Sequence, residues 1–270
     1  MNVFTNEGYF KEQIARARRL RWAGILSLAV VFVISILSIF ASLPPVVILL
    51  TYPFLLAGFP LMTIGRTRLK LLSRTPRDDQ LLNNELKGLN NKYALHHYVP
   101  IGDKVIKHLL VSPVGLVAIE TRDTMGQVIC KGGPKGDRWR VRTNFLDRFS
   151  GLNLPLGNPT QDLDGALARA REVLTSTGKS GVLAKGLIVF TRQSDLEVEG
   201  CTYPAVPLNE VKETIRSMLV ALGGDRAERA DTISIHNMLT SEDRRRINAL
   251  LAPPKPAVPQ KPTPAQKRGA

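Results

Sequence analysis

The sequence predicts an α/β domain that follows a hairpin of two apolar helices. Three observations indicate this fold class. A run of 44 residues carries no Asp, Glu, Lys, Arg or His side chain. Beyond that run, short strand-like segments alternate with amphipathic helical patterns, which is typical of α/β layers. The chain has 270 residues, of which 44% are hydrophobic and 22% charged, and this composition excludes a wholly disordered or collagen-like protein.

Most of the positive charge lies beside the apolar run and in the C-terminal tail. The net charge is +14. Residues 1–21 contribute +3, residues 66–74 contribute +4 and residues 252–270 contribute +4, which leaves +3 for residues 77–251. A domain that binds nucleic acid carries most of the excess positive charge of the chain on its own surface. Charge at both ends of an apolar run indicates a membrane segment instead.

The apolar run, Trp22–Gly65, is too long for a single membrane-spanning helix. One straight helix would measure about 66 Å, whereas the hydrocarbon core of a bilayer is about 30 Å thick. Ser42-Leu43-Pro44-Pro45 interrupts the run at its middle, and each half has about the 20 residues needed for one crossing. We therefore predict a two-helix transmembrane hairpin over residues 22–65. A soluble protein with a buried apolar helix pair is the alternative.

The charge pattern also predicts the orientation of the chain. Both flanks of the hairpin are rich in Arg and Lys, so the positive-inside rule predicts a multi-pass cell-membrane protein whose termini and domain are cytoplasmic. Cys130 and Cys201 are too few for a disulfide framework and fit a domain in a reducing compartment. The expected organisation is a basic N-terminal segment (1–21), the transmembrane hairpin (22–65), a basic juxtamembrane linker (66–76), a cytoplasmic domain (77–251) and a disordered Pro/Lys-rich tail (252–270).

Within residues 77–251, hydrophobic periodicity predicts the elements and their order. They are a helix from Leu81 to Leu89, strands over Tyr93–Ile101, Val105–Val111 and Gly115–Thr121, a hairpin of Val128–Lys131 with Arg138–Arg142, a helix opening at Asn158-Pro159, a strand at Gly186–Phe190, a helix over Val211–Leu222 and a last helix capped by Ser241. This order implies an α/β layer fold.

One strand pair resembles the signature of the nuclease-related domain family, abbreviated NERD. The stretch contains Lys107-His108 in an apolar strand, a turn at Ser112-Pro113, a strand ending in Glu120-Thr121-Arg122, and then Gly126. Asn158-Pro159-Thr160-Gln161 is similar to the helix start of the family, and Asp79 falls where the family commonly places a Glu. The resemblance covers about residues 78–195. It implies a restriction-endonuclease-like α/β/α core of the PD-(D/E)xK class.

The resemblance implies a site composed of Asp79, Lys107, Glu120, Arg122 and Gln161. In nucleases of this class, carboxylates on neighbouring strands hold Mg²⁺, which activates a water that attacks the phosphodiester. Here Lys107 stands at the position of the metal-binding Asp, and Arg122 stands at that of the catalytic Lys. An ammonium group repels a dication, and a guanidinium group is a poor substitute for a water-activating Lys.

We therefore expect a degenerate site without a metal cofactor. Its cations, Lys107 and Arg122, are expected to pair with Glu120 and Asp79. Asp103 lies about 13 Å along the strand from Lys107 and is too distant to restore the missing acid. Because neighbouring residues of a strand point to opposite faces, His96 and His97 cannot bind one metal together, and we expect His108 to be a packed residue.

A second candidate site is a basic stretch around the predicted hairpin turn. Arg138, Arg140 and Arg142 would share one strand face, with Trp139, Phe145 and Phe149 nearby. Cations with aromatic neighbours suit a nucleic-acid backbone with stacked bases, and a solvated hairpin facing anionic lipid is the alternative. The nucleic-acid-binding candidates are Lys131, Lys135, Arg138, Arg140, Arg142 and Arg148.

Three functional hypotheses follow. The first is a catalytically impaired, membrane-anchored module that binds nucleic acid, an acidic lipid surface or a protein partner. The second is an atypical Mg²⁺-dependent nuclease that uses Glu120 and Asp79, with Gln161 in support. The third is a purely structural assembly interface.

Overall fold

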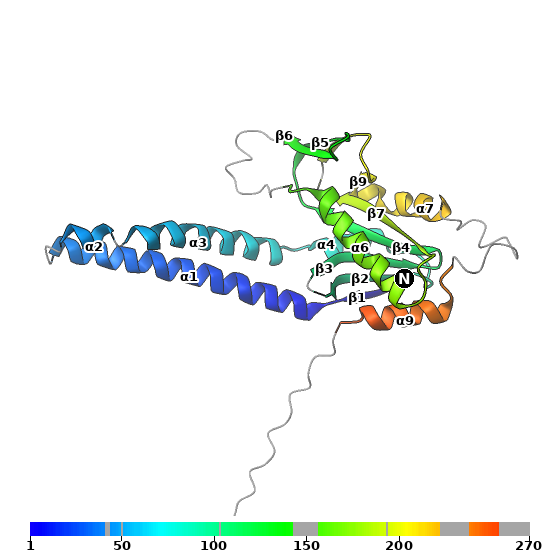
Figure 1. Cartoon of the computed structure of the whole chain (residues 1–270), viewed down its shortest axis with the longest axis horizontal. Coiled ribbons are helices and arrows are strands. Elements are labelled where there is room, and N and C mark those ends of the chain that lie inside the picture. The colour runs from blue at the N-terminus through cyan, green and yellow to red at the C-terminus, as the bar shows by residue number, and fades with distance from the viewer. Residues whose placement is uncertain are drawn as a thin grey trace, which may run out of the picture.

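The computed structural model describes residues 1–40, 44–49, 51–102, 104–142, 156–192, 194–221 and 238–253. A long helical hairpin projects from a body of sheet and helices (Figure 1). The helices are α1 (Glu7–Phe40), α2 (Pro45–Leu49), α3 (Tyr52–Leu72), α4 (Asp78–Glu85), α6 (Pro159–Ser176), η1 (Leu208–Glu210), α7 (Val211–Ala221) and α9 (Ser241–Leu251). The strands are β1 (Asn2–Thr5), β2 (Ala94–Ile101), β3 (Lys104–Ser112), β4 (Gly115–Arg122), β5 (Gly126–Lys131), β6 (Arg138–Arg142), β7 (Leu183–Phe190), β8 (Ser194–Glu199) and β9 (Ala205–Pro207). The structure confirms the mixed α/β class.

The larger sheet has six strands in the order β1-β2-β3-β4-β7-β9. Strands β2, β3 and β4 are antiparallel neighbours, and β7 joins β4 in parallel after the chain has passed through α6. Helix α6 covers one face with Leu163 and Leu167, while α4 and α7 cover the other with Leu82 and Ile215. A Cβ on Gly186 would lie 2.8 Å from Leu163 Cδ2, so α6 packs directly on β7. Helices on both faces explain why these strands are buried apolar runs.

Some elements differ from the prediction. Strands β1, β8 and β9 have no predicted counterpart, and β1 pairs in parallel with β2 at the edge of the larger sheet. The N-terminal segment is thus attached to the domain. Thr240, and not Ser241, caps α9, because the Thr240 hydroxyl accepts a hydrogen bond from the backbone N–H of Asp243. Leu222 and residues 254–270 of the predicted tail lie outside the described residues.

Helices α1 and α3 run antiparallel and pack closely along the projecting hairpin (Figure 1). A Cβ on Gly24 would lie 2.4 Å from the backbone nitrogen of Met62, and a Cβ on Gly65 would lie 2.5 Å from that of Arg21. Such close backbone approach at glycine is typical of helix pairs in membranes. Helix α1 is long and apolar enough to cross a bilayer, and only 6% of its most apolar stretch is buried. It is therefore a candidate membrane-spanning helix.

The two cysteines form one disulfide, whereas their small number fits a domain in a reducing compartment, where disulfides are rare. They are 71 residues apart in the sequence, so their spacing gives no signal of pairing. Strand β8 pairs in parallel with β5 and places Val198 opposite Cys130. The chain turns back just after β8, and Cys201 then reaches the sulfur of Cys130.

Candidate functional site

Two neighbouring strands bring the central residues of the predicted motif together. Lys107 on β3 donates from Nζ to Oε1 of Glu120 on β4, at 2.5 Å. Arg122 donates from Nη1 to the same Glu120 oxygen and from Nη2 to Asp162 of α6. The Glu120 side chain is only 6% exposed. We call Lys107, Glu120, Arg122 and Asp162 the ion-pair cluster, in which two cations hold one buried carboxylate.

Asp79 lies outside the ion-pair cluster, contrary to the expected pairing with Lys107 and Arg122. Its two carboxylate oxygens accept from Nε and Nη2 of Arg77, each at 3.1 Å. Burial raises the pKa of Asp79, although the positive charge of Arg77 acts in the opposite direction. The Arg77 guanidinium also lies over the ring of Phe10 in α1, 4.1 Å from its centroid. Asp79 therefore belongs to the junction between α4 and the helical hairpin.

Two acids outside the predicted set lie beside the motif. Asp78 accepts a hydrogen bond from the hydroxyl of Thr121, between Oδ2 and Oγ1 atoms 3.1 Å apart. Asp162, in the first turn of α6, pairs with Arg122. Each of these acids is next in sequence to a predicted residue. The start of α6 was predicted at the right place, whereas α4 begins at Asp78, three residues before the predicted Leu81. The orientation of each helix decided which side chain reaches the site.

Gln161, the other predicted member, contributes no side-chain contact to the ion-pair cluster. It is exposed, and its backbone N–H donates to Asn158 Oδ1 at 3.2 Å. Asn158 thereby caps α6, as the Asn-Pro sequence predicts. Asp103 lies outside the described residues.

The oxygen donors of the ion-pair cluster do not fit a Mg²⁺ ion. Mg²⁺ requires several oxygen ligands in near-octahedral geometry. Oε1 of Glu120 already accepts from both Lys107 and Arg122. A dication at this position would also meet two positive groups at short range. The two cations of the cluster therefore oppose a metal ion at Oε1 of Glu120.

A basic surface lies on the hairpin of β5 and β6. It borders a cavity of about 790 Å³. The arginines of β6 are exposed, while the residues between them face inward, so the predicted alternation is present. Lys131 pairs with Glu199 at 3.4 Å, and the other four cations form no ion pair with a described residue. We define the basic hairpin surface as Lys131, Lys135, Arg138, Arg140 and Arg142; Arg148, Phe145 and Phe149 lie outside the described residues.

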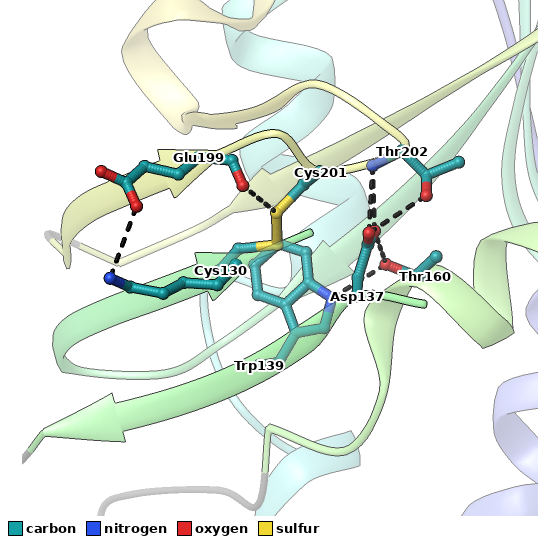
Figure 2. Close-up of a disulfide and its surroundings, with 8 residues drawn as sticks. Cys130, Asp137, Trp139, Thr160, Glu199, Cys201 and Thr202 are labelled. Atoms are coloured by element: carbon teal, nitrogen blue, oxygen red, sulfur yellow. Dashed lines mark hydrogen bonds and ion pairs between the residues drawn. A yellow bond between two sulfur atoms is a disulfide. The ribbon is translucent and has the colours of Figure 1, made fainter. Parts of the chain in front are cut away.

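Trp139 does not belong to the basic hairpin surface, which corrects its predicted stacking role. Its indole Nε1 donates to Oγ1 of Thr160 at 2.8 Å, and its ring lies 6.1 Å from that of Phe190. Figure 2 shows the indole beside the disulfide, opposite Cys130 in the strand pair. The strand alternation that exposes the arginines turns Trp139 to the core.

Asp137 holds the base of the β5–β6 hairpin (Figure 2). Its carboxylate accepts from the Thr160 hydroxyl at 2.7 Å and from the backbone and hydroxyl of Thr202 at 3.1 Å. Cys130, Asp137 and Cys201 place ligand-type atoms within 4.8 Å of one another. The sulfurs are bonded to each other and the Asp137 oxygens are engaged. This group therefore braces β6, α6 and the segment after β8.

Residues 77–191, from the residue before α4 to the residue after β7, match the family model described as nuclease-related domain, NERD. The chain contains a NERD domain. The match includes the motif strands and the basic hairpin surface, and it agrees with the resemblance seen in the sequence. No curated protein and no solved structure matches the chain.

Buried histidines connect the motif strands of the NERD domain to α4. Nε2 of His108 lies 3.1 Å from the hydroxyl oxygen of Thr121, which donates to Asp78. Nδ1 of His108 lies 2.6 Å from Nδ1 of His97, so one ring donates and the other accepts. Nε2 of His97 in turn lies 2.9 Å from Oδ1 of Asn83 in α4, so the two rings link Thr121 of β4 to that helix. His96 faces the opposite side of the sheet and contacts α9, as strand alternation predicts.

This histidine pair predicts that the NERD domain loses stability in mild acid. Burial lowers the pKa of His97 to about 4, with the charges of His96 and Arg77 acting in the same direction, and burial lowers the pKa of His108 well below its usual value. Below about pH 6.5 these histidines are protonated in the unfolded chain but stay neutral in the folded chain. The stability of the fold therefore falls as the pH drops from about 6.5 to 4. We expect a loss on the order of 2 kcal/mol from His97 between pH 7 and 5.

Thermal unfolding of the full chain in detergent, followed by circular dichroism across this pH range, measures the effect. The variant His97→Gln/His108→Gln keeps hydrogen-bonding side chains but cannot take up the protons, so its stability should vary less with pH. A variant with the same pH dependence as the wild type would contradict the assignment.

Proposed function

We propose that this protein is a membrane-anchored NERD-domain protein that binds nucleic acid at the cytoplasmic face of the membrane without hydrolysing it. The observation that carries the proposal is the ion-pair cluster, in which Lys107 and Arg122 occupy the motif acid Glu120. A metal-dependent nuclease of the restriction-endonuclease-like class needs free carboxylate oxygens at that point. In this proposal the core has the restriction-endonuclease-like fold, and the side chains of Lys107 and Arg122 block the position at which a metal ion would bind.

The pairing of β1 with β2 supports an anchor of two crossings. Strand β1 precedes α1 and β2 follows α3, yet both lie in one sheet. The two ends of the helical hairpin are therefore on the same side of the membrane, which requires an even number of crossings. Phe32 and Ile39 of α1 and Leu56 and Phe59 of α3 are more than 60% exposed. Contiguous apolar surface of this kind is covered by lipid when a helix spans a bilayer.

The basic flanks support a cytoplasmic domain. Residues 1–21 and 66–74 carry net charges of +3 and +4, and the positive-inside rule places such flanks in the cytoplasm. Reducing conditions there favour thiols over the Cys130–Cys201 disulfide. The hydrogen bonds of Asp137 join β6 to the same neighbouring segments, so we expect the basic hairpin surface to keep its place when the cysteines are reduced.

The basic hairpin surface supports nucleic acid as the ligand. Its arginines are exposed, lack acidic partners among the described residues and border one cavity of about 790 Å³. Guanidinium groups bind phosphate oxygens in pairs of parallel hydrogen bonds. Several such contacts along a backbone give affinity that depends steeply on salt.

The test combines binding and cleavage on the purified full chain in detergent. Labelled single-stranded DNA, duplex DNA and RNA are incubated with Mg²⁺ or Mn²⁺ and analysed by fluorescence anisotropy and by denaturing gel. We expect binding that weakens with salt and probes that remain intact. Metal-dependent cleavage that Glu120→Ala abolishes would establish the nuclease alternative. Failure to bind any probe at low salt would overturn the proposed ligand and favour an assembly interface.

A further inference from the structure

A second cleft lies between α3 and the strands that carry the ion-pair cluster. Its volume is about 420 Å³. One wall consists of α3 residues between Thr63 and Leu71, and the other consists of Asp78, Lys107 and residues 121–124. We infer that this cleft binds the phosphate headgroup of an anionic glycerophospholipid whose acyl chains lie along α3. The inference rests on the membrane placement of the helical hairpin proposed above.

The cleft lies at the depth of the lipid headgroups. The uncharged run ends at Gly65, which packs against the backbone of Arg21, the last basic residue before the run in α1. From Gly65 to Leu71 the helix rises about 9 Å at 1.5 Å per residue. The headgroup layer is about 5–8 Å thick on each side of the hydrocarbon core. A lipid phosphate beside α3 therefore reaches the level of the cleft.

Cationic donors remain available in the cleft. Arg68 is exposed and forms no ion pair with a described residue. Lys107 has a side chain that is 36% exposed, and two of its three N–H donors have acceptors in the structure. Nε of Arg122 is buried and has no acceptor among the described residues. An anionic phosphate in the cleft would accept charge-assisted hydrogen bonds from Arg68 and from the third N–H of Lys107.

Each of the two acids that line the cleft has a hydrogen-bond or ion-pair partner in the structure. Asp123 pairs with both Arg74 and Arg192, the latter at 2.6 Å. Asp78 accepts the hydroxyl of Thr121. Lys107 and Arg122 are paired with Glu120 and Asp162, so the exposed guanidinium of Arg68 is the lining cation that has no acidic partner among the described residues.

The apolar residues in the wall of the cleft favour an amphiphilic ligand. Ile64 and Leu71 line the cleft and are 45% and 40% exposed. They continue the exposed apolar surface of α3 toward the cations. A glycerophospholipid has the same order of groups, with acyl chains and glycerol next to the phosphate. A free phosphate ion would leave this apolar wall in contact with water.

Native mass spectrometry of the full chain in detergent, titrated with phosphatidylglycerol or phosphatidylcholine, tests the site. We expect the wild type to retain phosphatidylglycerol preferentially and Arg68→Gln to bind it about five- to tenfold more weakly, the loss of one charge-assisted contact. Arg66→Gln is the matched control, because Arg66 is an exposed arginine of the same helix that does not line the cleft. Its affinity should stay within about twofold of the wild type. Glycerol 3-phosphate and inorganic phosphate should compete poorly.

Two outcomes would overturn the site. Equal losses for Arg66→Gln and Arg68→Gln would indicate a diffuse basic belt, and efficient competition by inorganic phosphate would indicate a site for soluble anions. Flotation with phosphatidylcholine vesicles separates the inference from the anchor. A wild type that fails to float overturns both, whereas flotation with unchanged phosphatidylglycerol affinity in Arg68→Gln overturns only the lipid site.

Discussion

Reversing the charges of Arg138 and Arg140 should weaken nucleic-acid binding by the full chain about 100-fold. Both side chains are exposed on one face of β6 and border the cavity of the basic hairpin surface. Losing one charge-assisted phosphate contact makes binding less favourable by about 1.5 kcal/mol, which is a roughly tenfold loss of affinity. The new carboxylates also repel the backbone. Fluorescence anisotropy with labelled single-stranded DNA between about 50 and 200 mM salt measures both the affinity and its salt dependence.

The variant Arg171→Glu/Arg216→Glu is the matched control for this experiment. It makes the same change in net charge on exposed faces of α6 and α7, away from the cavity. We expect its affinity to stay within about threefold of the wild type and its salt dependence to be unchanged. Equal losses in the two double variants would show that net charge alone attracts the probe and would refute a defined binding surface.

The pairing of strands joined by short turns could be predicted from sequence because local rules specify it. Ser112-Pro113 marks a tight turn, so β3 and β4 are antiparallel neighbours, and Lys107 and Glu120 then lie close together. The bounds of β6 follow from alternation around a glycine-rich turn. Strand β1 could not be found in this way. It is short, and its partner is a strand that begins about 90 residues later.

The orientation of the helices could not be predicted, and it decides the membership of the site. Helix α4 starts at Asp78-Asp79, and either acid satisfies the preference for negative charge in the first turn. Packing of Leu82 against the sheet and of Arg77 against Phe10 turns Asp79 away from the cluster. For Trp139, in contrast, the signal was present in the sequence. An even spacing that exposes three arginines already places the residue between them on the other face.

Removing Glu120 should destabilise the domain strongly. Glu120→Ala leaves Lys107 and Arg122 next to each other without their shared carboxylate, and the Arg122 side chain is only 12% exposed. Removing one partner of a buried ion pair lowers the free energy of unfolding by about 3 kcal/mol. For a domain of this size that corresponds to a decrease of about 6–12 °C in the melting temperature. Thermal unfolding of the full chain in detergent, followed by circular dichroism, measures it.

The sign of the change in stability distinguishes a closed ion-pair cluster from a metal-binding site. A carboxylate that is kept to bind a metal is repelled by neighbouring acids, so its removal in metal-free buffer tends to raise stability. A carboxylate held between two cations has the opposite effect when it is removed. Glu197→Ala, at an exposed position of β8, is the control and should change stability by less than about 0.5 kcal/mol. Adding Lys107→Met to Glu120→Ala should recover part of the loss, because one uncompensated cation is removed. A metal-free Glu120→Ala protein as stable as the wild type would contradict the closed cluster and reopen the question of a metal at Glu120.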